Sequence, residues 1–123
     1  MHALVIDDSR IARRFLTGML KDLNLDVTEA SGGREGLERL RQLDKVDLVL
    51  VDHYMPDMAG IDVVHAIRAD PDRRGMRLVL VTGEEDPAQV RRVIEAGANE
   101  SIHKPFTVEV LRETLQRLGV IGG

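Results

Sequence analysis

The chain has 123 residues, of which 43% are hydrophobic and 31% charged, a composition typical of one globular domain rather than of a disordered segment. Its 17 basic and 21 acidic side chains give a formal net charge of -4, so there is no overall positive field that would attract nucleic acid. There is no cysteine, which excludes disulfides and thiolate catalysis, and no apolar stretch approaches the ~20 residues of a transmembrane helix. We expect a single domain over residues 1–123, located in the cytoplasm, because the first apolar run begins too close to Met1 to leave room for a signal peptide.

Short apolar runs alternate with helical patterns along the chain, which indicates repeated βα units and a parallel sheet. The run 48–51 is β-branched and apolar without alternation, so we expect it in the middle of the sheet, covered on both faces. The run 25–30 is expected at an edge. The predicted strands cover residues 3–6, 25–30, 48–51, 78–81 and 101–103.

The helical segments carry capping signals and apolar stripes. Asp8 or Ser9 is expected to cap the first helix, and Thr107 the last. Pro87 opens the fourth helix and Gly97 ends it, while the third ends before Pro71. The side chains expected to face inward are Ile11, Phe15, Met19 and Leu20 in the first helix, Leu37 and Leu40 in the second, Ile61, Val64 and Ile67 in the third, Val90, Val93 and Ile94 in the fourth, and Val108, Leu111, Leu115 and Leu118 in the fifth.

Four of the predicted strands end at reactive side chains. Asp7 and Asp8 follow the first strand, Asp52 the third, Thr82 the fourth and Lys104 the fifth. Side chains beyond the carboxyl ends of neighbouring parallel strands line one crevice, so these groups are expected to converge. Aspartates brought so close together repel one another, so either some of their pKa values rise or a cation neutralises them. An oxygen-only ligand set favours Mg²⁺ as that cation.

A carboxylate in such a site is also a nucleophile towards phosphorus. Attack by one of the aspartates would give an acyl phosphate. Lys104 would then balance the charge of the phosphoryl oxygens, and the Thr82 hydroxyl would donate a hydrogen bond to them. The sequence therefore predicts an acidic site for a metal ion and a phosphoryl group.

These motifs resemble the response-regulator receiver domain, the CheY-like phosphoacceptor module of two-component signalling. The resemblance covers essentially the whole chain and implies a flavodoxin-like, three-layer (βα)5 sandwich with a parallel five-stranded sheet in the order 2-1-3-4-5. It also implies a single receiver domain without an output domain. The residues that carry it are Asp7-Asp8, Asp52 followed by Met55-Pro56 and Gly60, Thr82, and Lys104-Pro105.

Carried over by position, the resemblance implies that Asp52 accepts a phosphoryl group from a histidine kinase, a histidine phosphotransfer protein or a small phosphodonor. Asp8, Asp52 and the backbone carbonyl of Tyr54 would bind Mg²⁺ directly, and Asp7 mainly through a metal-bound water. The domain would assist its own phosphorylation and dephosphorylation without being a conventional turnover enzyme.

Switching is also implied by the resemblance. Thr82, the Gly83 amide and Lys104 would contact the phosphoryl group, and Pro105 would be a cis or turn proline. The face formed by the fourth helix, fifth strand and fifth helix would bind a downstream protein, and the chain would be a monomer or a weak, phosphorylation-dependent dimer. Two positions depart from the family. The residue three before the lysine is usually Tyr or Phe, and here it is Ser101; the residue after the threonine is commonly alanine, and here it is Gly83, which should give a looser loop.

Two alternative functions stay open at this point. A haloacid-dehalogenase-like phosphatase also uses an aspartate nucleophile, Mg²⁺, a threonine and a lysine, but it needs Asp-x-Asp after the first strand, and Ser9 stands two residues after Asp7. A docking module that is never phosphorylated is the second alternative, which Ser101 keeps open. Arg10, Arg13 and Arg14 form either a partner-docking surface or a solvated basic face. The four histidines are scattered and lack the spacing of a zinc site.

Overall fold

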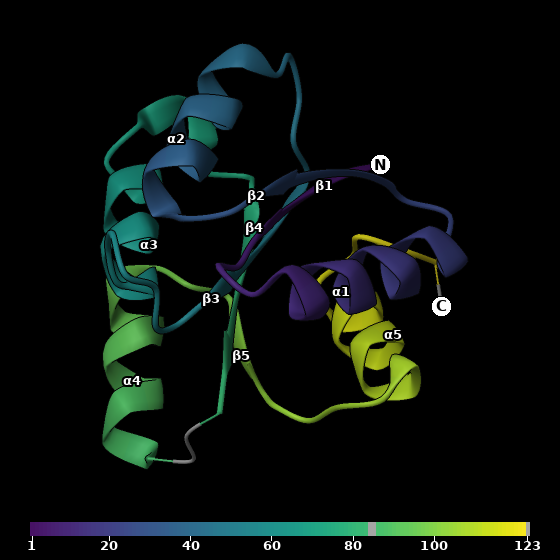
Figure 1. The fold of residues 1–123 in the computed structure, drawn as a ribbon. Helices are drawn as coiled ribbons and strands as arrows, with labels where there is room; N and C mark the ends of the chain where they lie inside the picture. The colour runs from purple at the N-terminus through teal and green to yellow at the C-terminus, as the bar shows by residue number, and fades with distance from the viewer. Residues whose placement is uncertain (84–85, 123) are drawn as a thin grey trace.

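A parallel sheet lies between two layers of helices in the computed structural model, which describes residues 1–83 and 86–122 (Figure 1). The strands are β1 His2–Ile6, β2 Asp26–Ala30, β3 Leu48–Asp52, β4 Arg77–Thr82 and β5 Glu100–His103. The helices are α1 Arg10–Asp22, α2 Gly33–Gln42, α3 Gly60–Arg68, α4 Pro87–Ala96 and α5 Val108–Arg117, with a short 3₁₀ turn over Pro71–Arg73.

The strand order is β2-β1-β3-β4-β5, and every neighbouring pair is parallel. This confirms the flavodoxin-like order 2-1-3-4-5, the central place of β3 and the edge position of β2. Helices α2, α3 and α4 cover one face of the sheet, while α1 and α5 cover the other (Figure 1). Each βα unit therefore delivers the carboxyl end of its strand to the same edge.

Two apolar cores follow from the alternation of side chains along the strands. Under α2, α3 and α4 the sheet contributes Leu4, Ile6, Val49, Val51, Leu78 and Leu80. Under α1 and α5 it contributes Ala3, Val5, Leu48, Leu50, Val79 and Val81. Because β1, β3 and β4 are buried on both faces, their sequences are apolar runs without alternation.

Helix α1 is turned differently from the prediction. Ser9 caps it, its Oγ accepting from the Ala12 amide at 3.2 Å, so the choice of Ser9 over Asp8 is resolved. The inward face, however, carries Leu16 and Leu20, whereas Ile11 is 75% exposed and Phe15 is 67% exposed. The prediction for Ile11 and Phe15 was wrong because two apolar stripes at i, i+4 spacing run side by side on this helix, and only one of them meets the sheet.

The other helices follow their predicted stripes with one exception. Val93 is fully buried in α4, but Ile94 is 42% exposed, so its inward placement was wrong. Only part of the apolar stripe of α4 contacts the sheet, because Val93 is buried there while Ile94, the next residue, is not. Gly97 ends α4 at a φ of 121°, a conformation that glycine adopts without strain. Among the described residues, no helix combines the length and the apolar character needed to cross a membrane.

Candidate functional site

Three aspartates meet at the carboxyl edge of the sheet. The parallel register pairs Ile6 of β1 with Val51 of β3, so Asp7 and Asp52, which follow them, come out side by side. One carboxylate oxygen from each of Asp7, Asp8 and Asp52 lies within 4.8 Å of the other two. The convergence expected at the carboxyl ends of the parallel strands is thus present in the structure.

Asp7 is the most deeply held of the three, with a residue exposure of 1%. Its Oδ1 accepts a hydrogen bond from the Ser9 amide at 2.8 Å, and its own amide donates to the Ala30 carbonyl at 3.1 Å, next to the β1–β2 ladder. Arg13 donates to the Asp7 carbonyl at 2.7 Å and pairs with Glu29 at 3.2 Å. Arg13 therefore supports the acidic edge and is not part of a solvated face.

Asp8 and Asp52 are less buried than Asp7. Asp8 is exposed, and Asp52 is half-buried at the end of β3. Gly60 makes room for the loop that follows Asp52, because a Cβ at position 60 would stand 2.4 Å from the Asp52 carbonyl oxygen. The Gly60 amide also donates to the His53 carbonyl at 2.8 Å, which closes the loop on itself.

Lys104 brings the positive charge into the site. Its Nζ lies 2.9 Å from Asp52 Oδ1 and 3.2 Å from Asp7 Oδ2. The Lys104 amide donates to the Thr82 carbonyl at 2.7 Å, which continues the β4–β5 pairing past the end of β5. The Lys104–Pro105 peptide bond is cis, the first of the two conformations expected for Pro105.

Among the residues that the structure describes, Lys104 is the cation paired with both Asp7 and Asp52, and this pairing determines the electrostatics of the site. Burial raises the pKa of Asp52, the hydrogen bond and charge of Lys104 lower it, and the charges of Asp7 and Asp8 raise it; the net pKa lies above the usual aspartate value. Burial would lower the pKa of Lys104, but the hydrogen bond and charge of Asp52 outweigh it, and Asp7 adds to the rise. The site is therefore short of positive charge.

The donor set fits a small divalent cation. Carboxylate oxygens without nitrogen or sulfur are the ligands that Mg²⁺ prefers, and the exposed side of the cluster gives access to water. Tyr54, whose backbone carbonyl was the fourth predicted ligand, follows in the β3–α3 loop with an exposed ring that packs edge-on to His53 at 4.3 Å between centroids. Its role as a ligand stays a prediction.

The predicted switch residues Thr82, Gly83 and Ser101 lie on or next to the last two strands of the sheet. Thr82 is buried at the end of β4, and the register places it beside His103 of β5. Gly83 is exposed, with its carbonyl 3.2 Å from His103 Nε2. Ser101 is half-buried and pairs with Leu80, so no aromatic ring stands at this place on β5.

Two residues were missed by sequence reasoning. His53, one of the four scattered histidines that lack the spacing of a zinc site, is buried directly behind the acidic edge and hydrogen-bonded to Gln89 of α4. Asp57 binds the amides of Gly33 and Arg34 at 3.1 and 2.9 Å, which ties the β3–α3 loop to the start of α2 and lowers the pKa of the Asp57 carboxyl. The N-cap of α2 is Gly32, which has no side chain to accept hydrogen bonds from the first amides of the helix. This was the available signal in the sequence that a carboxylate from another segment would accept them.

Known proteins are similar to this chain in both sequence and fold. Residues 3–116 match the response regulator receiver domain. The chain is 38% identical over 117 residues to the chemotaxis protein CheY1 of Helicobacter pylori, which covers 94% of each chain. CheY4 of Vibrio cholerae superimposes with a TM-score of 0.89 at 31% identity, over 95% of this chain and 97% of that one.

The same fold also occurs inside a longer protein. A probable two-component system response regulator/GGDEF domain protein superimposes with a TM-score of 0.91 at 32% identity, over 98% of this chain and 49% of that chain. Sequence, strand order and the acidic edge thus agree on one assignment. The chain belongs to the response regulator receiver domain family and is a CheY-like signalling domain.

Proposed function

We propose that Asp52 is the phosphoacceptor of this domain. The observation that carries the proposal is the Lys104 ammonium held 2.9 Å from Asp52 Oδ1, between that carboxylate and Asp7. A fixed cation beside a half-buried carboxylate at the carboxyl end of a strand supports this assignment, because the cation balances the charge that a phosphoryl group adds.

The transfer itself is an attack by an Asp52 oxygen on phosphorus. A P–O bond to Asp52 forms as the bond from phosphorus to the donor's histidine nitrogen breaks, and the electron pair leaves on that nitrogen. Lys104 then pairs with the phosphoryl oxygens, with the Thr82 hydroxyl and the Gly83 amide as further donors. The chain assists its own phosphorylation and dephosphorylation and is not a conventional turnover enzyme.

Asp8, Asp52 and the Tyr54 carbonyl are proposed to hold Mg²⁺, with Asp7 acting mainly through a bound water. The cation supplies positive charge for the phosphoryl oxygens and relieves the repulsion among the carboxylates. The three carboxylate oxygens within 4.8 Å of one another support this assignment.

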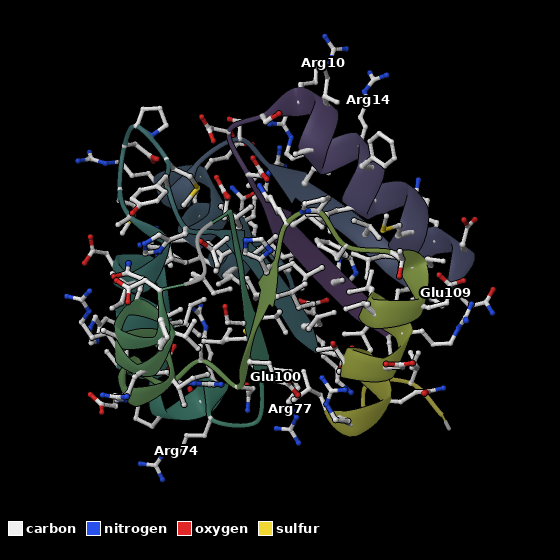
Figure 2. The ribbon with its side chains drawn as sticks, turned by 90° about the horizontal axis from the view of Figure 1, so that it is seen from below. Arg10, Arg14, Arg74, Arg77, Glu100 and Glu109 are labelled. Atoms are coloured by element: carbon white, nitrogen blue, oxygen red, sulfur yellow. The ribbon has the colours of Figure 1, made fainter. Side chains whose placement is uncertain are left out.

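A phosphodonor protein is proposed to dock beside α1. A groove of about 300 Å³ runs next to the site, lined by Ala12, Phe15, Leu16, Met19, Lys104, Pro105 and Phe106. Lys104 belongs to both the groove and the acidic site, so a histidine kinase or histidine phosphotransfer protein seated there has its phosphohistidine next to Asp52. Arg10 and Arg14 project from α1 away from the rest of the molecule (Figure 2). Their positive charges would attract an acidic surface of the partner.

Phosphorylation is proposed to act on the loops of Thr82 and Lys104 and on the α4-β5-α5 face, where a downstream protein binds. The curated relatives are chemotaxis proteins, which supports a protein partner for the output. A cytoplasmic location and a monomer or weak phosphorylation-dependent dimer belong to the same proposal.

Treatment with acetyl phosphate and Mg²⁺, followed by intact mass measurement, separates this proposal from its alternatives. A receiver gains one phosphoryl group, which decays on standing. A haloacid-dehalogenase-like phosphatase would instead release phosphate from monoesters over many turnovers. A docking module that is never phosphorylated would show neither, and either of these results would overturn the proposal.

A further inference from the structure

A buried imidazole lies directly behind the proposed phosphoacceptor. His53 follows Asp52 in the chain and is 3% exposed. Its amide donates to the Val81 carbonyl at 3.0 Å, and its carbonyl accepts from the Gly60 amide at 2.8 Å. Because the main chain is held on both sides, His53 can respond to its surroundings only through its ring.

The strand register places His53 beside Thr82. Side chains of β3 alternate, so Asp52 faces the α1 side, while Val51 and the following His53 face the α4 side. The hydrogen bond from the His53 amide to Val81 extends the β3–β4 register by one residue, which brings Thr82 next to His53 on the same face. Any displacement of the Thr82 side chain changes the space beside the ring.

Helix α4 reaches the same ring. The side-chain amide nitrogen of Gln89 is hydrogen-bonded to His53 Nε2. Gln89 Oε1 accepts from Arg92 at 2.6 Å, and this bond turns the amide so that its NH₂ faces the imidazole. An amide NH₂ only donates, so in this arrangement Nε2 accepts, and we assign the ring proton to Nδ1.

The other ring nitrogen has no such partner. His53 Nδ1 is buried and makes no hydrogen bond to any of the described residues. A buried donor without an acceptor is costly, so the ring is poised to change partner when a neighbour moves. Ser101, at the position where the resemblance to receiver domains implies an aromatic ring, is too small to fill space that Thr82 leaves.

We propose that His53 is a positioning residue that transmits the state of Thr82 to α4 through its hydrogen bond with Gln89. The inference rests on the proposed phosphorylation of Asp52. When Thr82 turns to the phosphoryl group, the imidazole follows into the space beside it, the Gln89 contact is lost, and the first turns of α4 are released. The readout thus passes through His53 rather than through a ring at position 101.

The tautomer of His53 tests the proposed hydrogen bond with Gln89 in the unphosphorylated protein, without any phosphodonor. Nitrogen-15 NMR of the ring is expected to show protonated Nδ1 and unprotonated Nε2 in the wild-type chain. In Gln89→Glu the carboxylate only accepts, so Nε2 is expected to carry a proton. A wild-type ring protonated on Nε2 alone, or a spectrum unchanged by Gln89→Glu, would overturn the inference.

Amide hydrogen exchange of α4 tests whether phosphorylation releases this helix through the contact between His53 and Gln89. Acetyl phosphate with Mg²⁺ is expected to speed amide exchange in Pro87–Ala96 of the wild type. In Gln89→Met, which cannot hydrogen-bond His53, exchange is expected to be fast already and to change by less than half as much, while phosphoryl labelling proceeds at the wild-type rate. Arg91→Ala, an exposed change on the same helix, is the matched control and is expected to keep the full response.

The two proposals fail in different ways. A phosphoryl adduct in both proteins, with the same α4 response in Gln89→Met as in the wild type, contradicts the role of His53 and leaves Asp52 as the acceptor. The absence of an adduct on the wild type contradicts the phosphorylation itself.

Discussion

Lys104 Nζ lies 2.9 Å from Asp52 Oδ1, and this contact is the centre of the acidic edge. The ammonium also lies 3.2 Å from Asp7 Oδ2, so one cation serves two carboxylates while a third, Asp8, stands beside them. This imbalance explains why the pKa of Asp52 is raised in spite of the ion pair, since burial and the two other aspartates outweigh Lys104.

The raised pKa predicts how the stability of the metal-free domain depends on pH. The folded state binds the Asp52 proton more tightly than the unfolded chain does. The resulting stabilisation is fully present below the ordinary aspartate pKa of 3.8 and is lost as the pH rises through the higher folded pKa. Asp52→Asn removes this dependence, so urea titrations without Mg²⁺ should show the variant gaining stability over the wild type as the pH rises to 7. If the stability of Asp52→Asn relative to the wild type fell as the pH rose, the predicted direction would be contradicted.

Asp8→Ala should weaken Mg²⁺ binding without unfolding the domain, because Asp8 is exposed and its loss relieves repulsion with Asp7 and Asp52. A ligand at one hundred times its Kd adds about 2.7 kcal/mol of stability. The rise in thermal midpoint that Mg²⁺ gives the wild type should therefore shrink in Asp8→Ala. Asp62→Ala, an exposed carboxylate at the start of α3, should keep the full rise. An unchanged Mg²⁺ effect in Asp8→Ala would remove Asp8 from the ligand set.

Phe15→Ala should separate donor docking from chemistry. The ring is 67% exposed and lines the groove beside Lys104, so its loss barely affects the fold but removes apolar surface that a partner would bury. Loss of roughly 1.4 kcal/mol of contact corresponds to about a tenfold slower transfer from any histidine kinase that phosphorylates the wild type. Labelling by acetyl phosphate should not change. Ile94→Ala, an exposed apolar residue of α4, is the control, and equal slowing in both variants would place the donor elsewhere.

Helix α3 offers a stabilising change. Its N-cap is Ala59, with extended backbone and no side-chain hydrogen bond to the first turn. Ala59→Ser supplies the missing acceptor and should raise the free energy of unfolding by about 1 kcal/mol. Ala66→Ser, in the exposed middle of the same helix, should be neutral or slightly destabilising. Equal effects in chemical denaturation would show that capping is not the cause.

The parallel sheet and the meeting of Asp7, Asp52 and Lys104 were predictable because parallel strands deliver their carboxyl ends to one edge. Apolar runs of β-branched residues identify such strands without any tertiary information. The strand order 2-1-3-4-5 was implied by the resemblance to receiver domains and did not follow from the residues themselves. The caps of α1 and α5 were predictable from the local sequence. The side-chain oxygens of Ser9 and Thr107 each accept a hydrogen bond from the amide three residues further along the chain.

The rotation of α1 was not predictable. Ile11 and Phe15 form as good an apolar stripe as Leu16 and Leu20, and only packing against the sheet selects between them. The contact of His53 with Gln89 joins residues 36 positions apart and depends on where α4 lies. A lone histidine after a strand carries no signal of such a contact, whereas the spacing of Glu35 and Arg39 does predict their 3.6 Å ion pair within one helix.

Intact mass measurement of wild type, Asp52→Asn and Asp62→Asn after treatment with acetyl phosphate and Mg²⁺ tests the central claim most directly. The account predicts one phosphoryl adduct on the wild type and on Asp62→Asn, and none on Asp52→Asn, whose amide is close in shape to the carboxyl but is not a nucleophile. The folded state of each protein is checked by circular dichroism. A normal adduct on folded Asp52→Asn would show that another residue accepts the phosphoryl group and would contradict the account.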